Sequence, residues 1–474
     1  MMASSSPFAF ANVRRFIAFR AFFNARFYYP VFTILFLDYG LTIEQFSLLN
    51  TVWAFTIVLA EVPSGALADL IGRKCLLVTT SLLMMMEMAV LAFVPLGNGS
   101  LIFSAFLLNR ILSGLAEALA SGADEAMAYD TLVAYGDPED WPRVLDIQMR
   151  VQNLAYIVTM TLGAMVYAPA TVNSVLHSMG LQLTLEQQVT MRFPVLLTLG
   201  LGFLALLTTL GMKDPLPPTR HEPEQGAWQR IVHVSQLTVA AGGWIMQTPM
   251  ALAIILFGMG FDHVLRMLIT MTSQYYRLIG LPEASFGLIG SGIALVGLAV
   301  PRLARAMVEH FSPRSNFFWL GGLALFSLWG ITLFIPGWGV VPVVLVFVAM
   351  MLTSFFTSHY LNMITASHQR ATVLSFKGLA FNAAYGTVGM LYAGLIAGLR
   401  RSVRATEPLW EGVQVENEAF RRSMHWFPWY LLAVMICIYL FCRLVRRRFP
   451  ARDGETGWKM NTIPKEEENH ERTV

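Results

Sequence analysis

The chain has 474 residues, of which 55% are hydrophobic and 13% are charged. A soluble globular protein carries about 25% charged residues, so this composition excludes an ordinary cytosolic enzyme. The near balance of 33 Lys and Arg against 30 Asp and Glu excludes a chain that binds nucleic acid through a basic domain. The composition therefore predicts a protein with many membrane-spanning helices.

The apolar segments are long enough to cross a bilayer. A spanning helix needs about 20 mostly apolar residues, because lipid offers its backbone no hydrogen-bond partners. We predict an all-α membrane protein with twelve transmembrane helices, at residues 14–38, 44–68, 75–95, 101–126, 144–168, 192–212, 249–277, 284–308, 316–336, 341–366, 373–398 and 426–444.

These spans divide the chain into two groups of six. We expect an N-terminal six-helix bundle in residues 1–212, a cytoplasmic linker in 213–248, a C-terminal six-helix bundle in 249–448 and a cytoplasmic tail in 449–474. The linker is rich in proline, and Trp228 to Trp244 within it could form a short interfacial helix.

Lys and Arg near the span ends set the expected orientation. They gather on one side of the predicted bundle, which places both termini in the cytoplasm. One connection disagrees, because residues 399–423 carry five arginines on the predicted outside, partly offset by four glutamates.

The two groups of spans resemble each other in sequence. A shift of 240 residues aligns Gly40-Leu41 with Gly280-Leu281 and Arg26 with Arg266, and a shift of 229 aligns Asn153 with Asn382. Arginine and asparagine are costly within lipid, so their recurrence is stronger evidence than apolar matches. The sequence therefore predicts two pseudo-symmetric bundles with a cavity between them, reached alternately from each side.

The connection between spans 2 and 3 carries a motif. It reads Gly65-Ala-Leu67-Ala-Asp69-Leu-Ile-Gly72-Arg73-Lys74. This resembles the loop signature of the major facilitator superfamily, G-x-L-A-D-x-x-G-R-K, and the twelve spans and two repeated halves extend the resemblance over the whole chain. The likeness is to bacterial members of unassigned substrate.

The resemblance implies a conformational gate at this loop. In the superfamily the cluster, together with an acidic residue near the end of span 4, stabilises the outward-open state. We expect the gate to consist of the loop residues and of candidate acidic partners: Gly65, Asp69, Gly72, Arg73, Lys74, Asp124, Glu125 and Asp130. The alternative is that Arg73 and Lys74 only set the topology.

We identify eight ionisable residues well inside the predicted spans. Leaving all of them facing lipid would cost on the order of 20 kcal/mol, so they must face protein, water or substrate. Similar depth in consecutive spans predicts two structural ion pairs, Glu87 with Arg110 and Glu117 with Arg150. The eight are Arg26, Glu61, Glu87, Arg110, Glu117, Arg150, Asp262 and Arg266.

Arg26 and Arg266 occupy equivalent positions in spans 1 and 7, which line the central cavity in the superfamily. Two facing guanidiniums could hold a carboxylate or phosphate, as in the organic-anion and organophosphate branches. Asp262 lies four residues before Arg266, and the alternative is a local Asp262–Arg266 pair. His263 completes the candidate substrate-binding set, although it could equally be a packing residue.

Proton-coupled transport requires protonatable groups within the spans. Glu117, Glu61 and Asp262 are the carboxylates best placed by depth. Glu61 could instead satisfy backbone groups freed by Pro63. Because span 5 lacks the proline expected of drug exporters, the sequence weakens that assignment.

These features predict a secondary active transporter that moves a small organic solute by alternating access, coupled to protons, for drug or metabolite export. One alternative is an organic-anion or organophosphate exchanger that uses an Arg26/Arg266 clamp, and another is a non-transporting scaffold or sensor. We expect no enzymatic activity, cofactor, metal site or nucleic-acid partner. The expected partners are a small-molecule substrate, protons and the lipid bilayer, for a monomer in the inner membrane of the cell.

Overall fold

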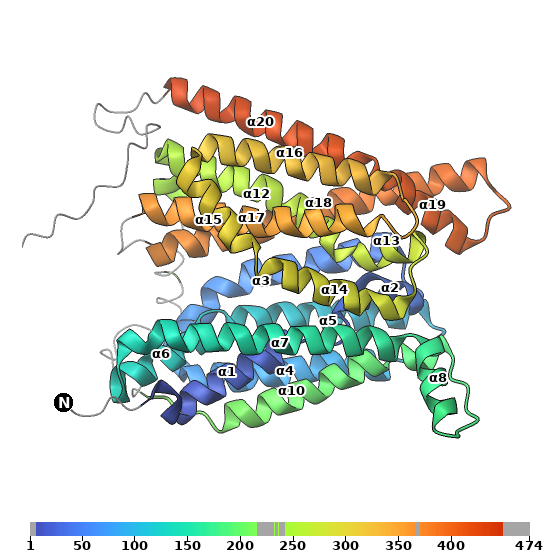
Figure 1. Ribbon diagram of the computed structural model, residues 1–474, viewed down its shortest axis with the longest axis horizontal. Coiled ribbons are helices and arrows are strands. Elements are labelled where there is room, and N and C mark those ends of the chain that lie inside the picture. The colour runs from blue at the N-terminus through green and yellow to red at the C-terminus, as the bar shows by residue number, and fades with distance from the viewer. Residues whose placement is uncertain (1–5, 216–231, 233–235, 237–241, 366–369, 449–474) are drawn as a thin grey trace, which may run out of the picture.

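The computed structural model describes residues 6–215, 232, 236, 242–365 and 370–448. Within these residues the regular elements are helices, without a strand, and they run roughly parallel in one bundle (Figure 1). The tail 449–474 and most of the interfacial helix expected at Trp228 to Trp244 lie outside this part of the chain.

The first half of the chain supplies the helices around α4, α5 and α7 (Figure 1). Two of them begin with side-chain caps, from Thr42 before α3 and Asn98 before α5. The elements are η1 (Pro7–Ala9), α1 (Ala11–Asn24), η2 (Tyr29–Val31), α2 (Phe32–Asp38), α3 (Ile43–Ile71), α4 (Arg73–Phe93), α5 (Gly99–Ala120), α6 (Ala123–Tyr135), η3 (Pro138–Asp140), α7 (Trp141–Tyr167), α8 (Pro169–Ser178), α9 (Gln187–Thr190) and α10 (Phe193–Leu210).

The second half repeats this organisation. Its helices are α12 (Pro249–Thr270), α13 (Thr272–Leu278), α14 (Glu283–Gly297), α15 (Val300–His310), α16 (Pro313–Thr332), α17 (Val340–Ile364), α18 (Arg370–Thr406), α19 (Gly412–Met424) and α20 (Trp426–Arg448). We call the end of the bundle that carries the N-terminus, α6 and α15 the N-terminal face, and the opposite end the α8/α19 face (Figure 1).

The first predicted span, residues 14–38, is broken in the structure. The α-helix ends at Asn24, and the chain resumes helical structure in η2 and α2. Pro30 lies at this break, where its missing N–H removes a helical hydrogen bond. The prediction of one continuous helix here was wrong, and the break places Arg26 between two helical segments.

Nine helices of the described chain are long and apolar enough to cross a membrane, or ten if the bent pair α7 and α8 forms one span. The two other predicted spans correspond to the broken first segment and to α16. The helices are therefore consistent with twelve crossings. The connection that the sequence placed at residues 399–423 is largely helical, because α18 continues to Thr406 and α19 follows.

The internal repeat is visible where the halves meet. Gly40 and Gly280 both have a positive φ, 97° and 79°, and both end the first segment of their half. The backbone N–H of Thr33 donates to Ser273 Oγ at 3.0 Å, across a separation of 240 residues. Residues related by the repeat are thus in direct contact, as expected near a pseudo-two-fold axis.

Two helix pairs make extensive contacts between the halves, and each is the repeat copy of the other. In α3, Thr51 Oγ1 donates to the Gly386 carbonyl of α18 at 3.1 Å. In α14, Ser291 Oγ donates to the Ile157 carbonyl of α7 at 3.2 Å. Shifts of 240 and 229 residues convert the first bond into the second. We call these two contacts the α3/α18 seam and the α7/α14 seam.

Small residues allow the seams to close. A Cβ atom at Gly287 of α14 would lie 2.1 Å from the Met160 carbonyl oxygen of α7. Because real Cβ atoms do not come so close, only glycine permits this contact.

We predict that Gly287→Ala lowers the free energy of unfolding by about 1–3 kcal/mol, because α7 and α14 must separate to admit the methyl group. Gly292→Ala is the matched control, since a Cβ there has no atom within 4 Å and the same helix holds both glycines. Thermal unfolding of the purified protein in detergent checks this. Equal melting temperatures for the two variants would contradict the close contact.

Candidate functional site

An ion-pair network joins the two halves at the α8/α19 face. Arg277 of α13 donates from Nη1 and Nη2 to the two carboxylate oxygens of Asp38 at 2.8 and 2.7 Å. The same guanidinium binds Glu283 Oε1, at 2.5 Å from Nη2, and the Tyr167 hydroxyl donates to Asp38. Because all four side chains are shielded from solvent to some degree, this bidentate pair closes the bundle at this end.

A second network lies at the same face, at the end of the α3/α18 seam. Arg400 of α18 contacts Glu44 of α3 at 2.5 Å and Glu416 of α19 at 3.0 Å. Glu44 belongs to the first half of the chain and the other two residues to the second. The two networks together hold both halves at the α8/α19 face.

Arg26 forms a fully buried ion pair within the first half. Its Nη1 lies 2.5 Å from Glu87 Oε1 of α4, and the two side chains are 1% and 0% exposed. The guanidinium also lies over the ring of Phe23. Since either charge alone would be very costly at this depth, each residue requires the other.

Glu117 of α5 is the unpaired carboxylate near this pair. It is half-buried, and it makes no hydrogen bond or ion pair with the described residues. Its charge interacts with those of Arg26 and Glu87. A change in the protonation of Glu117 would therefore act on a buried ion pair.

In the second half, Arg266 of α12 occupies the position equivalent to Arg26. It lies 2.6 Å from Asp262 Oδ2, donates to Asn382 Oδ1 at 2.9 Å and stacks over Tyr385. Lys377 of α18 interacts electrostatically with Asp262. This cluster differs from its first-half copy, because Asn153, the equivalent of Asn382, is exposed.

The predicted Arg26/Arg266 anion clamp is not supported by this arrangement. Each arginine is paired with a carboxylate of its own half, and Arg26 is almost inaccessible. The local Asp262–Arg266 pair, which the sequence offered as the alternative, is present.

His263 lies between two helices of the second half. Its Nδ1 is 2.6 Å from the Met259 carbonyl and its Nε2 is 3.1 Å from the Tyr430 hydroxyl of α20. Both ring nitrogens are therefore occupied, as in a packing residue.

The two ion pairs predicted from depth are wrong. Glu87 binds Arg26, whereas Arg110 donates from Nε and Nη2 to the Asn109 amide oxygen at 2.9 and 2.7 Å. Arg150 is 73% exposed and pairs with Asp146 one helical turn away. Depth along a helix does not reveal the direction in which a side chain points, and this is why both assignments failed.

Glu61 of α3 lies near the α3/α18 seam. Its Oε2 is buried without a hydrogen-bond partner among the described residues, and a Cβ at Gly378 of α18 would be 3.6 Å from Oε1. The side chain does not cap the backbone groups freed by Pro63, so that interpretation is not supported.

The loop between α3 and α4 is part of a charged cluster at the N-terminal face. Arg73 forms an ion pair with Asp130 of α6, and Arg20 of α1 lies 2.5 Å from Asp124 Oδ2 and also contacts Glu125. Thus all three candidate acidic partners are engaged, Asp130 with Arg73 and the other two with Arg20.

The start of the linker contacts the same loop. Asp214 Oδ1 accepts from the backbone N–H of Lys74 at 3.1 Å, and a Cβ at Gly72 would lie 3.0 Å from Asp214 Oδ2. Gly72 has a positive φ of 85°. Gly65 and Asp69 lie in α3, and their side chains are outside what the structure describes.

The sequence reasoning missed several of these groups. Lys377 was not counted among the charges inside the spans. The Asp38–Arg277 and Glu44–Arg400 pairs link residues more than 200 positions apart, and each lies near a predicted span end, where charge carries no signal of its own. The 240-residue shift relates Thr33 to Ser273. A search for contacts between residues related by this shift would have pointed to the region of Ser273 and Arg277.

We predict that Glu87→Gln destabilises the protein by about 3–5 kcal/mol, because Arg26 would remain buried without its counter-charge. Glu117→Gln, a control on the neighbouring helix, should change stability by less than about 1 kcal/mol, since Glu117 has no bonded partner. Denaturant unfolding in detergent measures both. A neutral Glu87→Gln would show that the pair is not needed for stability.

We also predict that Arg277→Gln opens the α8/α19 face, because it removes the contacts to Asp38 and Glu283. The measurement is maleimide labelling of Ser273→Cys, which is 2% exposed, after Cys75, Cys437 and Cys442 are replaced by serine. We expect the labelling rate to rise at least about tenfold, which corresponds to about 1.4 kcal/mol. Arg305→Gln, which removes an exposed pair on α15, is the control. An unchanged rate in Arg277→Gln would rule out a closing role for this network.

Comparisons with known proteins agree with this architecture. The family model described as Major Facilitator Superfamily matches residues 16–390. No curated protein matches the chain significantly. Among solved structures, a bacterial homologue of the human lysosomal transporter Spinster, in an inward-facing and unoccupied conformation, is 15% identical with a TM-score of 0.68, over 94% of this chain and 99% of that one.

Two further structures are similar at the level of the fold. The nucleoside transporter NupG is 13% identical with a TM-score of 0.62, over 93% of this chain and 98% of that one. A D-xylose-proton symporter is 12% identical with a TM-score of 0.60, over 91% and 97%. The family match covers most of the sequence, and its fold is the one described above. The chain belongs to the major facilitator superfamily and is a multi-pass membrane protein.

Proposed function

We propose that this protein is a proton-coupled secondary active transporter, without enzymatic activity, that moves a small organic solute by alternating access. The observation that carries the proposal is Glu117, an unpaired carboxylate placed beside the buried Arg26–Glu87 pair. The relatives support the general class, since the structural neighbours include a nucleoside transporter and a sugar–proton symporter.

The distribution of basic residues supports an orientation. Arg14, Arg15, Arg73 and Lys74 lie toward the N-terminal face, so the positive-inside rule assigns that face to the cytoplasm. Both described ends of the chain then lie on the cytoplasmic side. The protein itself lies in the inner membrane. The α8/α19 face is external, and the contacts at Asp38–Arg277 and Glu44–Arg400 close it.

Alternating access requires these external contacts to break and the cytoplasmic ends to approach. The Arg73–Asp130 pair lies at those ends and is a candidate for the gate that the loop resemblance implies. The role of Asp69 and Gly65 in this gate stays a prediction.

Glu117 can couple protons to this motion through Arg26. When Glu117 is ionised, Arg26 experiences two carboxylates, whereas protonation leaves Glu87 as its main counter-charge. Such a change in charge alters the relative populations of conformations that differ in the contacts of Arg26. Glu61 and Asp262 are secondary candidates for the proton-binding group. Asp262 is already paired with Arg266.

The solute is best sought among neutral or zwitterionic polar compounds. The two arginines related by the repeat, Arg26 and Arg266, are each paired with a carboxylate, so the geometry does not favour exchange of organic anions or organophosphates. A scaffold or sensor role has no specific observation in its favour.

We predict that Glu117→Gln abolishes proton coupling while solute exchange persists. Purified protein in proteoliposomes with an internal pH dye is tested against nucleosides, pentoses, short peptides and carboxylates. With the wild-type protein, a transported compound should change the pH of the vesicle lumen. Glu117→Gln should remove at least about 90% of this pH change but retain counterflow of labelled solute.

Glu139→Gln, an exposed carboxylate at the N-terminal face, is the matched control and should behave as wild type. Coupled transport that survives Glu117→Gln would assign the proton to another group. A solute flux that does not change when a pH gradient is imposed would contradict proton coupling.

A further inference from the structure

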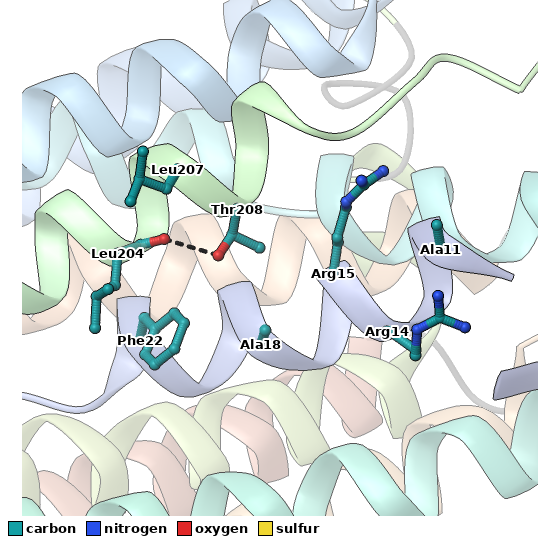
Figure 2. Close-up of a pocket in the computed structure, with 8 residues that line it drawn as sticks. All are labelled: Ala11, Arg14, Arg15, Ala18, Phe22, Leu204, Leu207 and Thr208. Carbon is teal, nitrogen blue, oxygen red and sulfur yellow. Dashed lines mark hydrogen bonds between the residues drawn. The ribbon is translucent and has the colours of Figure 1, made fainter. Parts of the chain in front are cut away.

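A groove runs along the outer surface of the first half, between α1 and α10 near the N-terminal face (Figure 2). It holds about 420 Å³ and does not involve the residues assigned to transport above. The lining residues are Ala11, Arg14, Arg15, Ala18, Phe22, Leu204, Leu207 and Thr208.

One end of the groove is cationic. Arg14 donates from Nη1 to the Phe8 and Ala9 carbonyls at 2.6 and 2.8 Å, and it makes no ion pair with the residues that the structure describes. Arg15 lies against Gly211, where a Cβ would be 2.9 Å from its Nε, and it makes no ion pair within the described chain. Two guanidiniums without an acidic partner among the described residues therefore share one end of the groove.

The rest of the groove is apolar. Phe22 and Ala18 of α1 face Leu204 and Leu207 of α10 across it (Figure 2). The single hydroxyl there, on Thr208, is occupied, since Oγ1 donates to the Leu204 carbonyl at 2.7 Å. Leu204 and Leu207 are 41% and 51% exposed on a surface that faces the membrane. An apolar channel with a cationic end matches an amphiphile that carries a negative headgroup.

We propose that this groove binds one anionic phospholipid, with its phosphate at Arg14 and Arg15 and an acyl chain between α1 and α10. The charge complementarity identifies the headgroup, and the alignment of the groove with α1 places the chain along the bilayer normal. A free phosphate would use only the arginine end and leave the apolar channel empty.

The bound lipid would stabilise α1 against α10. Helix α1 continues from Arg15 to Arg20, which pairs with Asp124, and ends immediately before Arg26. Occupancy of the groove therefore tightens the helix that leads into the buried ion pair. The inference does not depend on which solute is transported.

The test is lipid binding to purified, delipidated full-length protein, followed by native mass spectrometry and thermal unfolding. Phosphatidylglycerol should bind more tightly and raise the melting temperature more than phosphatidylcholine of the same chains. Because each arginine near the membrane surface contributes about 1 kcal/mol, Arg14→Gln/Arg15→Gln should weaken phosphatidylglycerol binding about 30-fold.

Arg443→Gln is the matched control, since Arg443 is also exposed at the N-terminal face, on α20. It should retain wild-type binding. If the double glutamine variant does not fold, two other variants test the groove. Arg14→Lys/Arg15→Lys keeps the positive charge and should retain phosphatidylglycerol binding. Leu207→Asp places a negative charge in the apolar channel and should lose phosphatidylglycerol binding.

Three outcomes would overturn the proposal. Equal binding of phosphatidylglycerol and phosphatidylcholine would remove the headgroup preference. Equal stabilisation by inorganic phosphate alone would show that the acyl channel contributes nothing. An equal loss in Arg443→Gln would show that any surface arginine suffices.

Discussion

A charge inside an apolar helix bundle must find an opposite charge, and the structure depends on how this protein meets that requirement. Arg26 lies where the first span is interrupted, and Glu87 of α4 meets it there with both side chains removed from solvent. This pair ties the break between α1 and η2 to α4. The pair also makes Glu117 important, because the charge of Glu117 interacts with both members of the pair. Protonation of Glu117 therefore changes the electrostatic energy of the pair. The functional proposal therefore follows from an energetic requirement of the fold.

The two halves satisfy the same requirement differently. In the second half, Arg266 is held by Asp262 four residues earlier on its own helix and by Asn382 on α18. Its first-half copy is held by a different helix, and Asn153 is left exposed. One seam hydrogen bond, from Thr51 to Gly386, recurs in the other seam as the bond from Ser291 to Ile157, whereas the charged interior differs between the halves. This difference agrees with the proposal above, which places proton coupling at Glu117 in the first half.

Much of the fold could be predicted from the sequence, because apolar segment length and an internal shift are properties that a chain records directly. The repeat shifts of 240 and 229 residues recur in the hydrogen bonds of Thr51 and Ser291. The candidate site was less accessible. Arg110 and Arg150 were paired by depth alone, but the rotation of each helix about its axis decides which face a side chain occupies. The break at Pro30 was also missed, since the surrounding residues are apolar enough for a continuous helix.

The composition of the seams has a consequence for the speed of transport. The contacts at Gly287, Gly386 and Gly389 include glycine backbone and short hydroxyl side chains, and the larger side chains packed at the seams include Phe55, Trp53 and Met160. Glycine and short hydroxyl side chains lose almost no rotamer freedom when they are brought together, so the contacts that they make separate with little change in side-chain entropy. The directional contacts between the halves that must also break on opening include the two ionic networks at the α8/α19 face. A seam of this kind makes the rate of the conformational change adjustable at a few charged positions.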